Sequence, residues 1–61
     1  MDRRQLEKHM RRHDCSPKRE GGKHSIWENP ENGTTASVPR HREVNDHTAR
    51  GICKDLGIPP P

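Results

Sequence analysis

The apolar residues of this chain are grouped in two helical stripes, one near each end, and this grouping limits most strongly how the chain can fold. Four residues near the C-terminal end share the spacing i, i+3, i+4 and i+7 of one helix face: Ala49, Ile52, Cys53 and Leu56. Asn45 or Asp46 can cap the start of this helix, and Gly57 stands where a helix-ending glycine is favoured. The pattern predicts a helix that reaches to about residue 56.

The stripe near the N-terminal end is narrower. Good helix formers follow Asp2, a plausible N-cap, and Leu6, Met10 and His13 stand at i, i+4 and i+7 with His9 beside them. The next residue, an aspartate, tolerates the left-handed conformation that ends many helices. A helix with so little apolar surface needs another layer to lie on.

Two strand patterns lie between the stripes. His24–Glu28 is a compact strand candidate that holds Trp27, the only aromatic residue of the chain. Thr34–Val38 is the returning strand, and Pro39 stops it. Because side chains alternate along a strand, Ser25 and Trp27 share one face, and Ile26 and His24 share the other. If His24 faces solvent, Trp27 must face the helices.

Turn signals separate these strands. Asn29–Gly33 is a strong turn, and its final Asn-Gly pair can take positive φ at both positions. The preceding segment, residues 15–20, contains a proline and few β-formers, so it predicts at most a short edge strand. Gly21 and Gly22 supply the turn after it.

The order is therefore helix, two or three strands, helix. Both helices carry one apolar stripe, so both must cover the same face of a small antiparallel sheet and leave the other face open. Only 23% of the 61 residues are apolar and 34% are charged. We expect a thin two-layer α+β fold of marginal stability, assisted by a partner chain or by dimerisation.

Charge and hydropathy restrict the surroundings in which the chain can work. The net charge is +3 with histidines neutral, which favours polyanions such as nucleic acid or an acidic protein surface. No run of 18 or more apolar residues occurs, so no membrane span is predicted. The first residues lack the apolar stretch of a signal peptide, which points to the cytoplasm.

Several motifs resemble one known family. Gly22 to Trp27, the Asn-Gly turn, Val38-Pro39-Arg40-His41 and the closing helix from Thr48 to Gly57 resemble the HicA toxins, the RNA-cleaving members of bacterial toxin–antitoxin pairs. The resemblance runs from Leu6 to Pro59 in the family's order and spacing. It implies a single HicA-like domain over residues 1–58, with residues 59–61 as a proline tail.

The resemblance also implies a fold and an activity. The fold is double-stranded-RNA-binding-like, α-β-β-β-α. The activity is cleavage of messenger RNA without metal or other cofactor, through His24, and a HicB-like antitoxin covers that histidine. The chain departs from the family pattern at Lys23, at Asp14 and in the Cys15-Ser16-Pro17 segment, where a more apolar first strand is usual.

A histidine suits this chemistry. The 2′-hydroxyl of RNA must lose a proton to attack the neighbouring phosphate, and the 5′-oxygen must gain one as it leaves. A histidine side chain has an ordinary pKa of about 6.5, so it can serve either step. The predicted RNA-contact residues supply positive charge, close backbone approach or a second histidine: Arg19, Gly22, Lys23, Ser25, Arg40 and His41. His41 is the candidate for the second proton transfer, but the sequence leaves open whether it lies near His24, and a mechanism with a single histidine is equally allowed.

Alternative interpretations remain open at this point. The same fold could be a non-catalytic RNA-binding module in which His24 is only a contact residue. His9 and His13 have the spacing of two metal ligands, and Cys15 follows closely, but a partly buried pair of helix histidines explains them better. A Cys15–Cys53 disulfide is disfavoured in a cytosolic chain. The oligomeric state, a homodimer or a toxin–antitoxin hetero-oligomer, is not determined.

Overall fold

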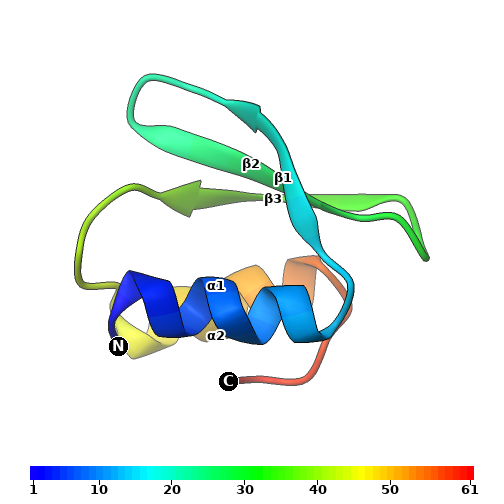
Figure 1. Ribbon diagram of the computed structural model, residues 1–61. Helices are drawn as coiled ribbons and strands as arrows, with labels where there is room; N and C mark the ends of the chain where they lie inside the picture. Colours follow the sequence, from blue (N-terminus) through cyan, green and yellow to red (C-terminus); the bar gives the residue numbers. More distant parts are fainter.

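The computed structural model describes all 61 residues and places two helices beneath a three-stranded sheet (Figure 1). The elements follow one another in the order α1 Arg3–Arg12, β1 Ser16–Glu20, β2 His24–Asn29, β3 Thr34–Pro39 and α2 Asp46–Asp55. The sheet is antiparallel with β2 in the centre, and both helices cover the same face. The predicted α+β fold, α-β-β-β-α with one open sheet face, is confirmed.

The register of β2 and β3 decides which side chains enter the core. Trp27 lies opposite Ala36, and Ser25 lies opposite Val38. All four are buried, whereas His24 is exposed. The alternation predicted from the sequence is therefore confirmed: His24 lies on the open face and Trp27 faces the helices.

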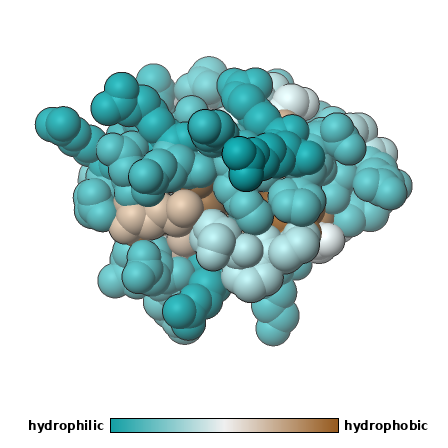
Figure 2. All heavy atoms as spheres, turned by 60° about the horizontal axis from the view of Figure 1, so that its bottom comes forward, coloured by the Kyte–Doolittle hydropathy of each residue, from teal (hydrophilic) through white to brown (hydrophobic).

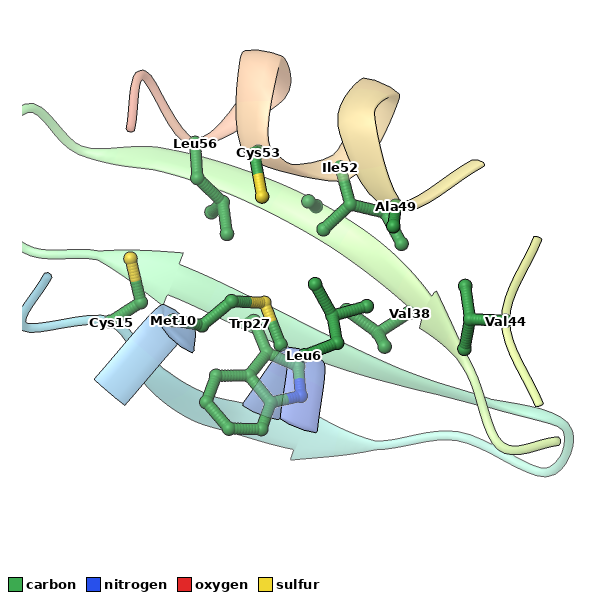
Figure 3. Packing of buried hydrophobic residues seen from close by; sticks show 11 residues of the cluster. Leu6, Met10, Cys15, Trp27, Val38, Val44, Ala49, Ile52, Cys53 and Leu56 are labelled. Atoms are coloured by element: carbon green, nitrogen blue, oxygen red, sulfur yellow. The ribbon is translucent and has the colours of Figure 1, made fainter. Parts of the chain in front are cut away.

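The core is a single cluster of eleven buried residues between the sheet and both helices (Figure 3). Trp27 is its largest side chain and is 2% exposed, with the Arg11 guanidinium 5.1 Å from the ring centroid. Val44, in the loop between β3 and α2, also belongs to the core. Its backbone N–H donates to the Met1 carbonyl at 2.7 Å, and this hydrogen bond holds the loop against the start of α1.

Both helices begin and end as their end residues predict. The carboxylate of Asp2 accepts from the Arg4 N–H, and the side chain of Asn45 accepts from the His47 N–H, so each helix has a side-chain N-cap. Each helix also ends with a left-handed residue, Asp14 at φ 66° and Gly57 at φ 68°. The surface over the helices is mostly hydrophilic, with a small apolar area near the middle of this face (Figure 2).

The loop between β2 and β3 differs from the prediction. Only Gly33 has positive φ, at 72°, whereas Asn32 does not. The connection is longer than a two-residue hairpin, and the side chain of Asn32 is engaged: it accepts from the Thr34 N–H and donates to the Leu56 carbonyl. The loop is thus anchored to the end of α2 through Asn32. It has one left-handed residue and not the predicted pair.

The segment after α1 forms the third strand that the sequence left uncertain. Every residue of β1 is exposed, as expected of an edge strand, and the register shifts between Pro17 and Arg19.

Cys15, just before β1, is buried, as is Cys53, and both thiols are free. Both helices are too short and too polar to span a membrane.

Candidate functional site

His24 is the first residue of the central strand and directly follows the β1–β2 turn. Its carbonyl accepts from the Gly21 N–H at 2.7 Å, and its Cα is in register with that of Pro39. The backbone is therefore fixed on both sides. The imidazole ring is exposed on the open sheet face, and no hydrogen bond or ion pair within the chain engages it. The imidazole is therefore accessible to a bound ligand.

The turn beside His24 depends on one glycine. A Cβ atom at Gly21 would lie 2.8 Å from the His24 carbonyl oxygen, a separation too short for any side chain. Gly22 is different, because a Cβ atom there would meet nothing within 4 Å. Sterics inside the chain thus explain Gly21 but give Gly22 no structural role. The RNA-contact role predicted for Gly22 stays a prediction.

Three cationic side chains lie around the hairpin. Arg19 on β1 pairs with Ile26 across the strands, and it lines a shallow hollow of about 400 Å³ on the open face together with Lys18. Arg19 forms no ion pair, whereas Lys18 lies 3.3 Å from a Glu28 carboxylate oxygen. Lys23, directly before His24, is exposed as well. The open face near His24 therefore carries positive charge that is not neutralised within the chain.

Arg40 ties the end of β3 to the hairpin. Its N–H donates to the Lys23 carbonyl at 3.2 Å, and its guanidinium donates to the Gly21 carbonyl at 3.1 Å. The same guanidinium lies 3.7 Å from the carboxylate of Glu20. Arg40 thus has a structural task in addition to the predicted RNA contact. Its guanidinium contacts the same Glu20 carboxylate that accepts from the buried Ser25 hydroxyl, so the RNA contact predicted for Arg40 stays a prediction.

The side chain of Ser25 does not share this surface. It is 8% exposed, lies on the helix-facing side of the sheet and donates to the Glu20 carboxylate at 3.0 Å. Its hydroxyl is therefore turned away from the imidazole of His24, so we leave Ser25 out of the candidate site. Glu20 was missed in the sequence, because a two-residue turn at Gly21-Gly22 would place it opposite Lys23, whereas the register of the strands places it opposite Ser25.

His41 lies in the loop after β3, where it is exposed. No hydrogen bond joins it to His24 or to any other residue of the chain. Its proposed role as a second proton-transfer group therefore stays a prediction.

The residues considered for zinc are engaged in other contacts. The rings of His9 and His13 lie edge to face with centroids 4.9 Å apart, and His9 Nε2 is 2.7 Å from the Pro59 carbonyl oxygen. Cys15 packs into the core, and no three metal-binding side chains come together. Burial also raises the pKa of the Cys15 and Cys53 thiols, which keeps them protonated and makes them poor nucleophiles.

Comparison with known proteins gives one match. Residues 3–58 match the family model described as the HicA toxin of bacterial toxin–antitoxin systems, which is nearly the whole chain. Searches of curated proteins and of solved structures give no match.

Proposed function

The chain belongs to the HicA family, the toxins of bacterial toxin–antitoxin pairs, and from that premise we propose that it is a metal-independent endoribonuclease that cleaves messenger RNA. His24 is the general acid or base of the reaction. The observation that carries the proposal is the imidazole of His24. It is exposed next to the β1–β2 turn, has no hydrogen-bond partner within the chain, and has unpaired cationic side chains nearby.

The proposed reaction is a transphosphorylation with two proton transfers. The 2′-oxygen attacks the adjacent phosphorus, so a 2′-O–P bond forms, the P–O5′ bond breaks and a cyclic phosphate results. A base takes the 2′-hydroxyl proton, and an acid supplies one to the departing 5′-oxygen. His24 can perform one of these transfers, and Arg19 and Lys23 can neutralise the charge that develops on the phosphoryl oxygens. The required 2′-hydroxyl makes the reaction specific for RNA over DNA.

The same surface suits inhibition by a partner. The open sheet face carries His24 and Arg19 and is covered by no element of the chain. We propose that a HicB-like antitoxin binds over this face and shields the imidazole. Messenger RNA as substrate would place the toxin in the cytoplasm.

The test is His24→Ala compared with His47→Ala, because His47 is also an exposed histidine but lies in the first turn of α2. Loss of a positioned acid or base should slow cleavage of a messenger RNA about 10²–10⁴-fold, with the circular dichroism spectrum and RNA binding unchanged. H47A should cleave at the wild-type rate. Unchanged cleavage by H24A would refute the catalytic assignment. Wild-type protein that binds RNA without cutting it would instead support a non-catalytic RNA-binding module.

A further inference from the structure

A second cationic site lies where α1 begins and β3 ends. A groove of about 310 Å³ is lined there by one carboxylate and four guanidinium groups, those of Asp2, Arg3, Arg4, Arg40 and Arg42. The groove joins the helix layer to the end of the sheet that carries the β1–β2 hairpin, at the left of Figure 1. Asp2, Arg3 and Arg4 do not belong to the site predicted around His24.

The backbone holds the groove in a fixed shape. The Arg3 N–H donates to the Arg42 carbonyl at 2.9 Å, and the Arg3 guanidinium donates to the Arg40 carbonyl. The helix start is thereby joined to both arginines of the loop after β3. An isolated β-bridge between Asp2 and Glu43 adds to this connection. The backbone that carries these arginines is therefore fixed before any ligand binds.

The positive charge in the groove is only partly neutralised. The Asp2 carboxylate is occupied as the N-cap of α1, with the Arg4 N–H at 2.8 Å, and the Arg4 side chain lies 3.8 Å away and is 82% exposed. Arg42 has no carboxylate partner. Arg3 lies 3.6 Å from Glu7, and Arg40 lies 3.7 Å from Glu20. Arg4 and Arg42 are thus the two cations most available to an outside anion.

Concentrating arginines in this way opposes folding through repulsion between like charges. The same residues offer planar donor groups that match the oxygens of a phosphate. Arg40 connects the groove to the nuclease site, because its N–H binds the Lys23 carbonyl directly before His24. A strand of RNA whose reacting phosphate lies at His24 can therefore continue past Arg40 into the groove.

We propose that this groove binds a phosphate of the RNA substrate that flanks the one being cut. The inference rests on the proposed function, because RNA is the polyanion that the nuclease site would hold. The groove contributes affinity and places the strand, and it takes no part in the chemical step.

The test measures binding without cleavage. The probe is a single-stranded RNA with 2′-O-methyl groups, which cannot undergo attack by the 2′-oxygen, titrated by fluorescence anisotropy at several salt concentrations. The double variant R4Q/R42Q is compared with R50Q/K54Q, which removes the same charge from exposed positions of α2 outside the groove. A third variant, R4K/R42K, keeps the charge.

We expect R4Q/R42Q to bind the probe about tenfold more weakly than wild type. The slope of log K against log salt should also fall by about 0.7 for each phosphate that the protein no longer neutralises. R50Q/K54Q should change both quantities much less, and R4K/R42K should keep most of the slope. Equal affinity of the two charge-removing variants would overturn the proposal.

The two proposals fail in different ways. If the nuclease assignment were wrong, wild-type protein would not cut unmodified RNA, whatever the anisotropy shows. If only the groove were wrong, wild type would cut RNA, and R4Q/R42Q would bind the methylated probe like the α2 control. Unchanged thermal unfolding of R4Q/R42Q, followed by circular dichroism, ensures that weaker binding is not caused by unfolding of the variant.

Discussion

At the scale of single residues, Trp27 is the side chain on which the packing of the core most depends. It is the only aromatic side chain and is almost completely buried, yet its indole N–H has no hydrogen-bond partner. A buried N–H without a partner loses its hydrogen bonds to water and gains nothing in return. Trp27 is therefore retained for its volume and not for its polar atom.

This predicts different outcomes for two substitutions of Trp27. Trp27→Phe keeps an aromatic ring and removes the unpaired N–H, so it should lower the free energy of unfolding by only about 1 kcal/mol. Trp27→Ala should cost about 3–5 kcal/mol, comparable with the roughly 3–9 kcal/mol that a domain of this length has in total. Urea unfolding followed by circular dichroism measures both. A Phe variant as damaged as the Ala variant would show that the indole N–H is bonded after all.

At the scale of elements, both helices end in the same motif. After α1, the Asp14 N–H binds the Arg11 carbonyl, and the Cys15 N–H binds the Met10 carbonyl. After α2, the corresponding donors are Gly57 and Ile58. In each case a left-handed residue reverses the chain and brings an apolar residue onto the core, as in the Schellman motif. The two motifs differ in that one uses aspartate where the other uses glycine.

Replacing the left-handed aspartate is expected to stabilise the protein. Asp14 at φ 66° bears a conformational cost that glycine avoids. Asp14→Gly should raise the free energy of unfolding by about 0.5–1 kcal/mol, which corresponds to a melting temperature higher by roughly 2–8 °C. Thermal unfolding followed by circular dichroism is the measurement. A lower melting temperature would mean that the Asp14 side chain makes a stabilising contact.

The glycine after α2 is expected to tolerate no side chain. Gly57 has φ 68°, and a Cβ atom there would lie 2.7 Å from Asn32 Nδ2, which donates to the carbonyl that ends the helix. Gly57→Ala should cost about 1–2 kcal/mol from backbone strain alone, and more from the steric overlap with Asn32. Gly33→Ala is the matched control, because φ is 72° but no atom lies within 4 Å. Equal destabilisation of the two variants in urea unfolding would show that the overlap with Asn32 is unimportant.

At the scale of the whole molecule, the β1–β2 turn, the end of β3 and the start of both helices lie at the same end (Figure 1). The candidate nuclease site and the arginine groove both lie there, and Arg40 lines the groove. The other end carries the β2–β3 loop and the ends of the helices, where Asn29 and Asn32 donate to the Leu56 carbonyl. The two candidate cationic sites thus lie at one end, and the asparagine contacts that join the β2–β3 loop to α2 lie at the other.

The fold and the proposed activity are expected to survive removal of metal ions. The His9 ring is bonded to the Pro59 carbonyl, Cys15 is buried, and no cluster of three metal-binding side chains is present. Excess EDTA should leave the melting temperature and the rate of RNA cleavage unchanged, as measured by circular dichroism and gel electrophoresis. Unfolding by the chelator would show that a zinc ion holds the chain together.

Local patterns of the sequence were sufficient to predict the elements. The stripe from Ala49 to Leu56, the alternation around Trp27 and the residues at the helix ends predicted a helix, two or three strands and a second helix, with His24 and Trp27 on opposite sheet faces. The third strand was implied only by the family resemblance. These properties depend on residues only a few positions apart. Side chains that share a helix face are three or four residues apart, and side chains that share a strand face are two apart.

Only the tertiary structure could decide which distant residues meet. Val44 enters the core through its bond to Met1, the side chain of Asn32 reaches the end of α2, and Arg3 at the first helix reaches the loop of Arg40. Such contacts depend on the way the layers pack, and no local periodicity encodes that packing. The sequence could therefore point to His24, whereas the groove of arginines became visible only when the start of α1 and the loop after β3 lay side by side.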